Sequence, residues 1–215
     1  MSANLSQSPF GIRQNERVAV YIDGPSFFST CKEIELDVDF NKLLEHFRSH
    51  CVLYRITYYL VLPEDRSTPN QVFKLKHWLE CNGYQVVSKT SREIRDDRVE
   101  GGVRKSRVNL HCEIGNEMLS TAFSNRADRM VLFSADPDLV DAVRRVQERG
   151  VNVTLVSSLE TRFKPGNELR SAAAGGFVEL DDDSIVDIVE RKGREIAIPS
   201  REAQVFPPIR QGGGR

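Results

Sequence analysis

The sequence lacks the features that mark several large classes of protein. Its four cysteines are scattered over 215 residues without a Cys-x-x-Cys pair, which argues against a structural zinc site and against a disulfide framework. No apolar run approaches the roughly 20 residues that a helix needs to cross a bilayer. The polar first residues also lack the apolar core of a signal peptide. We therefore expect a cytoplasmic protein that does not enter a membrane.

An excess of charge of one sign is missing as well. The chain has 30 Lys and Arg residues and 31 Asp and Glu residues, which gives a formal net charge of −1. So balanced a chain has no global field that would draw it to nucleic acid or anionic lipid, and any such affinity must come from a local patch. The hydrophobic content of 40% is enough for one buried core in a chain of this length.

Apolar runs alternate with helical patterns along the chain, which indicates an α/β fold with a parallel sheet built from βαβ units. Strands are predicted at residues 17–22, 52–60, 84–88, 129–133, 151–156 and 177–180. Helices are predicted at residues 40–49, 70–81, 108–123, 137–149, 167–174 and 184–192. The two ends show no periodicity, so we expect a disordered segment at residues 1–15 and a flexible tail at residues 193–215, around one domain at residues 16–192.

Acidic residues follow two of the predicted strands directly. Residues 134–138 read Ser-Ala-Asp-Pro-Asp and place Asp136 and Asp138 where a strand ends and a helix begins, while an earlier apolar run ends on Asp23. Ligands of an open parallel sheet bind outside its carboxyl edge, where the strand order reverses. If the first and fourth strands are neighbours there, these acids come within side-chain reach. Unpaired acids at buried strand ends require a cation, so the pattern predicts a site for Mg²⁺ or Mn²⁺.

Simpler roles stay open for several of these side chains. Asp136 precedes a proline and could do no more than cap the following helix. Ser26 and Ser134 could donate hydrogen bonds to the carboxylates or to a water on the metal, although hydroxyl groups are common at strand ends. On the predicted helix at residues 108–123, Glu113 and Glu117 are four residues apart and share one face. They either lie on a solvated face or complete the acidic pocket.

The segment before that helix, residues 89–107, is rich in basic residues and contains a Gly-Gly pair. Such a segment is either an ordinary solvated loop or, beside an acidic metal pocket, a surface for a polyanionic backbone.

No histidine of the sequence is well placed near the acids. If the site hydrolyses a phosphate ester, we therefore expect a water molecule bound to the metal to protonate the leaving oxygen.

Several segments, taken in order, resemble the NYN domain, a branch of the PIN-like metal-dependent nucleases, and more closely its LabA-like bacterial members. The resemblance covers roughly residues 17–183. It rests on the motif Val-Tyr-Ile-Asp-Gly at residues 20–24 and on the segments at residues 105–119, 132–140, 149–153 and 169–173.

The resemblance implies a Rossmann-like α/β/α sandwich with an acidic pocket that binds Mg²⁺ or Mn²⁺ and, in active members, hydrolyses RNA. By position, Asp23 and Asp136 would be metal ligands, and Asp138 a direct or water-mediated ligand. The position of the family's acid on this helix corresponds to Asn109, Glu113 or Glu117, depending on the register.

We therefore predict a metal-dependent endoribonuclease-like protein that acts on RNA, most simply on single strands. The metal would activate water and stabilise charge on the phosphate. The predicted catalytic acids are Asp23, Asp136, Asp138, Glu113 and Glu117, of which the first four hold the metal. The predicted RNA contacts are Arg104, Lys105, Arg107, Ser26, Ser134 and Asn109.

The alternative is a catalytically degenerate domain that binds RNA or a protein partner as a regulator, for example as a homodimer. A phosphatase of small phosphoesters is disfavoured, because the first strand does not end in a nucleophilic Asp followed by a second Asp two residues later.

Overall fold

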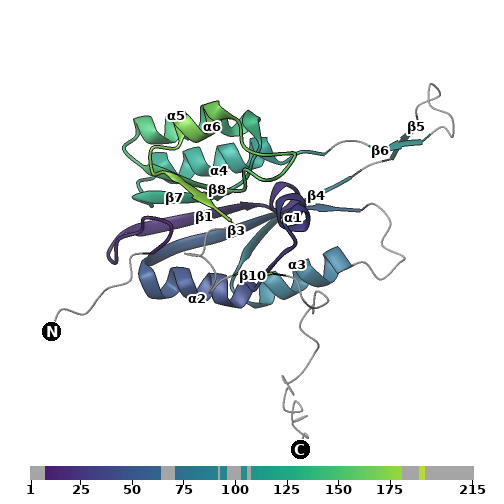
Figure 1. The fold of residues 1–215 in the computed structure, drawn as a ribbon, viewed down its shortest axis with the longest axis horizontal. Helices are drawn as coiled ribbons and strands as arrows, with labels where there is room; N and C mark the ends of the chain where they lie inside the picture. The colour runs from purple at the N-terminus through teal and green to yellow at the C-terminus, as the bar shows by residue number, and fades with distance from the viewer. Residues whose placement is uncertain are drawn as a thin grey trace, which may run out of the picture.

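The computed structural model describes residues 8–63, 71–91 and 108–180, together with the backbone of three short strands at residues 93–95, 103–105 and 189–191. In these residues a six-stranded sheet lies between two layers of helices (Figure 1). All neighbouring strands of this sheet run parallel. The predicted α/β sandwich with a parallel sheet is therefore confirmed.

The strand order places the site. In chain order the strands of the main sheet are β1 (Arg17–Asp23), β3 (Val52–Leu62), β4 (Gln85–Thr90), β7 (Arg129–Phe133), β8 (Asn152–Ser157) and β9 (Phe177–Glu179). In space they are ordered β4-β3-β1-β7-β8-β9. The chain builds outward from β1 to β4 and then returns to the other side of β1, so the order reverses between β1 and β7. Ile22 of β1 is paired with Phe133 of β7, which confirms the predicted adjacency of these strands.

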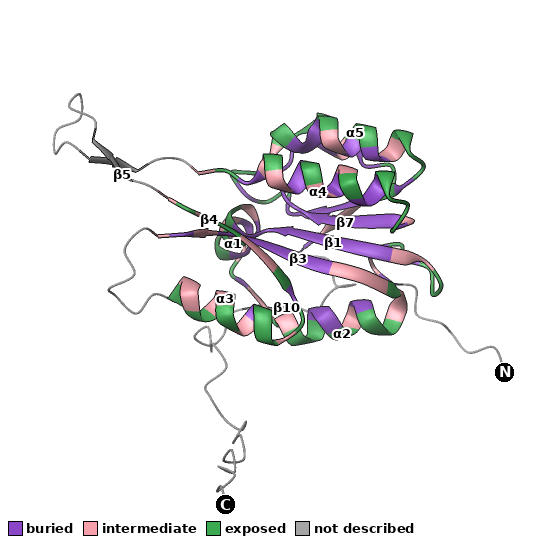
Figure 2. Ribbon diagram, turned by 180° about the vertical axis from the view of Figure 1, so that it is seen from behind, coloured by how far each residue is buried: buried purple, intermediate pink, exposed green. Residues whose placement is uncertain are grey.

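Helices cover both faces of the sheet. In chain order they are α1 (Gly24–Glu33), α2 (Phe40–His50), α3 (Gln71–Cys81), α4 (His111–Phe123), the 3-10 helix η1 (Pro137–Leu139), α5 (Val140–Glu148) and α6 (Asn167–Ala172). Buried residues of α1, α2 and α3 belong to one apolar core, and those of α4, α5 and α6 to a second core. Figure 2 shows the buried strands between helices whose outer faces are exposed.

The strand β1 alternates between these two cores. Val18, Val20 and Ile22 pack on the side of α1 to α3, whereas Ala19 and Tyr21 pack on the side of α4 to α6. Successive side chains of a strand point to opposite faces, so a central parallel strand covered on both faces is apolar at every position. This is why the strand read as one continuous apolar run in the sequence.

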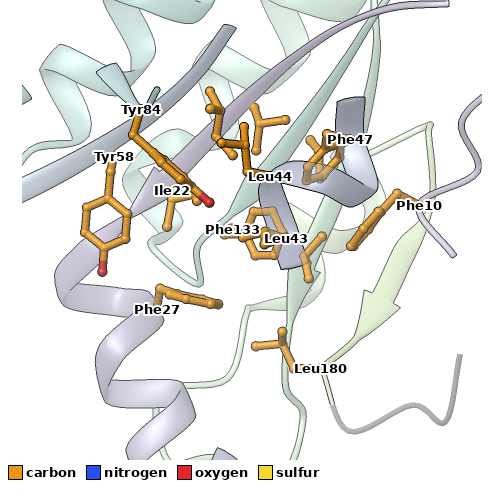
Figure 3. Packing of buried hydrophobic residues seen from close by; sticks show 14 of the residues in the cluster. Phe10, Ile22, Phe27, Leu43, Leu44, Phe47, Tyr58, Tyr84, Phe133 and Leu180 are labelled. Atoms are coloured by element: carbon orange, nitrogen blue, oxygen red, sulfur yellow. The ribbon is translucent and has the colours of Figure 1, made fainter. Parts of the chain in front are cut away.

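The structure corrects the predicted N-terminal boundary. Residues 8–15 were expected to be disordered, but Phe10 is only 1% exposed. Its ring stacks on Phe47 with centroids 5.1 Å apart and meets Phe133 edge-on at 5.9 Å. Figure 3 shows Phe10 beside Phe47 in the core formed with α1 and α2. Phe10 and Ile12, both buried in this core, place the segment within the folded domain.

Several short strands were not predicted from the sequence. Part of the helix predicted at residues 184–192 is the strand β10 (Val189–Arg191), which pairs antiparallel with β2 (Leu36–Val38). Residues 184–188 and 192 lie outside the described part. The basic segment contains the antiparallel pair β5 (Glu93–Arg95) and β6 (Val103–Lys105).

The helix α1 was not predicted at all. It begins at Gly24-Pro25, which reads as a turn in isolation. Proline is nevertheless favourable in the first turn of a helix, and Asp23 caps that turn.

Among the residues that the structure describes, every helix is too short or too polar to serve as a membrane span.

Candidate functional site

Two aspartates stand at the ends of neighbouring strands, at the point where the strand order reverses. Asp23 is the last residue of β1, and Asp136 lies three residues beyond the end of β7. Each also caps the helix that follows it: Asp23 Oδ1 accepts from the Ser26 amide at 3.4 Å, and Asp136 Oδ1 accepts from the Asp138 amide at 2.9 Å. Capping thus uses one oxygen of each carboxylate. The second oxygens face other groups of the site.

Serine side chains tie the two strand ends together. Ser134, which is 1% exposed, donates its hydroxyl to Asp23 Oδ2 at 2.8 Å and accepts from the Asp136 amide at 3.1 Å. The hydroxyl of Ser26 accepts from the Ala135 amide at 2.9 Å. Of the two serines proposed to donate to the carboxylates, Ser134 does so, while Ser26 binds the backbone of the neighbouring strand end. These bonds fix the spacing of the two aspartates.

The carboxyl group of Asp23 is in an unfavourable position for a negative charge. Its burial raises its pKa above the ordinary value, the hydrogen bonds from Ser134 and Ser26 oppose that rise, and the charge of Asp136 adds to it. A positive charge nearby would remove this penalty. A cation bound near Asp23 would therefore stabilise the charged form of this carboxyl group.

A histidine lies beside the acids, and this corrects the expectation that none would. His111 is the first residue of α4, and its Nδ1 lies 3.4 Å from Asp138 Oδ2 and 3.8 Å from Asp136 Oδ2. This nitrogen is buried and has no hydrogen-bond partner among the described residues. One ligand atom each from His111, Asp136 and Asp138 lie within 4.8 Å of one another. We refer to these three residues as the His-Asp-Asp group.

The sequence carried a weak signal for His111. The predicted helix began at residue 108, whereas α4 begins at residue 111. With the correct start, His111 occupies the first turn of a helix that packs against η1 and α5, which follow Asp136. The first residue of such a helix lies near the carboxyl edge of the sheet. Because the predicted helix began three residues too early, His111 was placed within the helix and not at this edge.

The two glutamates of α4 have cationic partners of their own. Glu113 pairs with Lys89 of β4, with Oε1 2.6 Å from Nζ, and its Oε2 is buried without a described partner. Glu117 pairs with Arg55 at 2.6 Å and accepts a hydrogen bond from the Tyr59 hydroxyl, also at 2.6 Å. Neither belongs to the His-Asp-Asp group. The two like charges are tolerated on one helix because each faces a separate cation.

The residues predicted to contact RNA are placed only in part. Asn109 is exposed just before α4, and its backbone carbonyl oxygen accepts from Lys89 Nζ at 3.4 Å. Arg104 and Lys105 belong to β6, of which the structure describes the backbone, and Arg107 lies outside the described residues. Lys89 is a basic residue at this edge that the sequence reasoning had not singled out from the charged segment around it.

The exposed side of the site is formed by the His-Asp-Asp group. The Asp138 side chain is 62% exposed, whereas those of Asp136 and His111 are 25% and 20% exposed. Asp23 lies beneath them and is 7% exposed. A solvent-accessible edge with two carboxylates and an imidazole above a buried carboxylate can accept a cation from solution.

Comparison with known proteins agrees with this architecture. A family model described as the NYN domain matches residues 17–181. The chain is 27% identical over 186 residues to the low amplitude and bright protein LabA of Synechococcus elongatus, which covers 85% of this chain and 94% of that protein. A crystal structure of a protein of unknown function from Vibrio parahaemolyticus has the same fold, with a TM-score of 0.62 and 21% identity, covering 88% of this chain and all of that one. Because the family model spans most of the sequence, the chain belongs to the NYN domain family, as a LabA-like member.

Proposed function

We propose that this protein is a divalent-metal-dependent ribonuclease that hydrolyses phosphodiester bonds of single-stranded RNA at the edge where β1 and β7 end. The observation that carries the proposal is the His-Asp-Asp group above the buried Asp23. Membership of the NYN domain family supports it, because this family is a branch of the PIN-like nucleases. The divalent ion that we propose from the sequence is either Mg²⁺ or Mn²⁺.

The residues present fit a divalent cation. The buried Nδ1 of His111 has no hydrogen-bond partner, although two carboxylate oxygens lie nearby. Burial is the main cause of the raised pKa of Asp23, and the charge of Asp136 adds to it, so a cation bound nearby would favour the charged form of this carboxyl. When bound, a divalent ion supplies positive charge that stabilises a phosphate and lowers the pKa of water. The chain would hold it through Asp136, Asp138 and His111, with Asp23 as the supporting charge.

Other residues of the edge would prepare the site and position the RNA. Ser134 holds the Asp23 carboxylate in one orientation through its 2.8 Å hydrogen bond. Lys89 lies at the same edge and pairs with Glu113. A lysine here, together with Arg104, Lys105 and Arg107, would contact phosphates of the backbone without reading the bases.

A second candidate is a regulator that binds RNA or a protein without cutting, for example as a homodimer. It is favoured by the ion pairs of Glu113 and Glu117 with Lys89 and Arg55. With both glutamates so engaged, fewer acids remain for a metal than the five that the sequence had suggested. A site with fewer ligands binds a metal more weakly. The protein would then bind RNA or a protein partner without hydrolysing RNA.

The test is incubation of a 5′-labelled single-stranded RNA with the wild-type protein and with Asp136→Asn, in Mn²⁺, in Mg²⁺ and with EDTA. The matched control is Asp141→Asn, because Asp141 is an aspartate of α5 whose side chain is 86% exposed. We expect cleavage by the wild type and by the control variant, and none by Asp136→Asn or with EDTA.

Equal cleavage by wild type and Asp136→Asn would contradict the proposed active site. Retarded RNA in a gel-shift experiment without any product in either ion would support the regulator instead. Loss of cleavage in Asp136→Asn but not in Asp141→Asn separates activity of this protein from that of a contaminating nuclease, which would not respond to either substitution.

A further inference from the structure

We propose that His111 is a metal ligand that makes this site select Mn²⁺ over Mg²⁺, an inference that rests on the proposed metal site and deepens it.

The first step is the position of the imidazole. Nδ1 of His111 lies 3.4 Å from Asp138 Oδ2 and 3.8 Å from Asp136 Oδ2, and the three ligand atoms of the His-Asp-Asp group lie within 4.8 Å of one another. Metal–ligand bonds of about 2.0–2.6 Å bring ligand atoms of one ion to roughly this separation. A small movement of these side chains would therefore place one ion between all three.

The second step is the state of the nitrogen. The Nδ1 atom is buried and makes no hydrogen bond with a described residue, although two carboxylates are in reach. A buried polar atom without a partner is costly, and its presence calls for an explanation. Coordination of a cation satisfies the nitrogen and the two carboxylates together, which a hydrogen bond to one aspartate would not do.

The third step is the chemistry of the ligands. Mg²⁺ requires near-ideal octahedral geometry, prefers oxygen ligands and keeps several of its waters. An imidazole suits first-row transition ions, which bind mixed nitrogen and oxygen ligands more tightly than Mg²⁺ does. Two carboxylates alone would serve both ions. Replacing one oxygen ligand by the His111 nitrogen therefore favours Mn²⁺.

The fourth step is the support of the ligand. His111 is fixed at the start of α4, whose next turns bury Ile114 and Met118 in the core shared with β7 and β8. Asp138 belongs to η1, and Asp136 caps this short helix through the hydrogen bond that its Oδ1 accepts from the Asp138 amide. The ligands thus come from two elements that pack against each other, so the packing of α4 on η1 brings the nitrogen close to the oxygens.

The test measures metal binding without RNA. Wild type, His111→Asn and the control His77→Asn, whose histidine is exposed on α3, are titrated with MnCl₂ and with MgCl₂ by calorimetry, and their melting temperatures are recorded in each ion. We expect His111→Asn to weaken Mn²⁺ binding at least about tenfold, while Mg²⁺ binding changes much less. The control should behave as the wild type. Pulsed electron paramagnetic resonance of the Mn²⁺-loaded wild type should show coupling to an imidazole nitrogen.

Several results would overturn the proposal. Equal losses for both ions, no loss, or tighter binding by His111→Asn would each do so; tighter binding would show that His111 serves the aspartates as their own counter-ion. If His111→Asn does not fold, the pulsed electron paramagnetic resonance of the wild type decides: absence of coupling between Mn²⁺ and an imidazole nitrogen would overturn the proposal. An Asp136→Asn variant that binds Mn²⁺ as well as the wild type would instead remove the proposed metal site, which separates the two failures.

Discussion

Replacing Glu117 by alanine separates a stabilising role of this residue from a role in the metal site. Glu117 joins α4 to β3 through Arg55 and Tyr59, and the Thr57 hydroxyl lies 3.4 Å from its Oε1. Tyr59 is fully buried, and its burial, with the hydrogen bond to Glu117, raises the pKa of its hydroxyl, which therefore stays a proton donor. Removing the carboxylate leaves this donor and the Arg55 guanidinium without their partner.

The size of the effect follows from burial. A buried hydroxyl that loses its acceptor costs about 1–3 kcal/mol. The ion pair has side chains that are 32% and 17% exposed, so its loss costs less than the roughly 3–5 kcal/mol of a fully buried pair. Because both effects share one carboxylate, we expect about 2–4 kcal/mol in total. For a protein of this size, each 1 kcal/mol lowers the melting temperature by about 2–4 °C.

The assay is urea unfolding of wild type, Glu117→Ala and Glu117→Gln without metal, followed by melting in Mn²⁺. Glu117→Gln keeps an acceptor for Tyr59 and should lose less stability than the alanine variant. A double-mutant cycle with Tyr59→Phe should show a coupling of about 1 kcal/mol or more. A loss below about 0.5 kcal/mol for Glu117→Ala would refute the reasoning. If Mn²⁺ no longer raised the melting temperature of this variant, Glu117 would belong to the metal site, as one of the three helix positions that the family resemblance leaves open.

Three other perturbations test the fold that holds the site. Gly24→Ala should destabilise the protein by at least about 2 kcal/mol in urea unfolding, because a methyl group there would collide with the backbone carbonyl of Tyr59. Phe10→Ala should cost about 3–5 kcal/mol; a change within about 0.5 kcal/mol would mean that its segment is not part of the domain. Arg17 forms hydrogen bonds with both oxygens of Asp128 and lowers the pKa of that carboxyl. The charged Asp128 therefore stabilises the fold at pH values above the ordinary aspartate pKa of about 3.9. This stabilisation is lost as the pH falls through the lowered pKa that Asp128 has in the folded protein. Melting temperatures of wild type and Asp128→Asn should accordingly converge in acid.

The parallel sheet could be predicted because its strands are buried on both faces. A strand such as β7 is apolar at residues 130–133, so the apolar run covers all of the strand except its first residue, Arg129. Acids at the ends of two such strands then had to lie on one edge, whatever the loops between them do. The common order of parallel strands placed β1 and β7 side by side, and with them Asp23 and Asp136.

The elements that were missed depend on contacts between distant residues. The helix α1 starts at a glycine and a proline, and it is stabilised by Asp23 and by packing of Phe27 on Phe133. Phe10 belongs to the fold because its ring stacks on Phe47, which lies 37 positions further along the chain. Neither contact leaves a periodic pattern in the sequence, since each partner lies on an element far along the chain.

The sequence by itself determined the α/β class, the parallel strands and the edge at which the acids gather, because these follow from local burial and from the direction of strands. Tertiary structure alone decided which side chains meet there. It brought His111 to Asp136 and Asp138, and it gave Glu113 and Glu117 their own cations. The physical reason is that charge compensation acts over a few ångströms between side chains, and those distances are set by how α4 packs on the sheet.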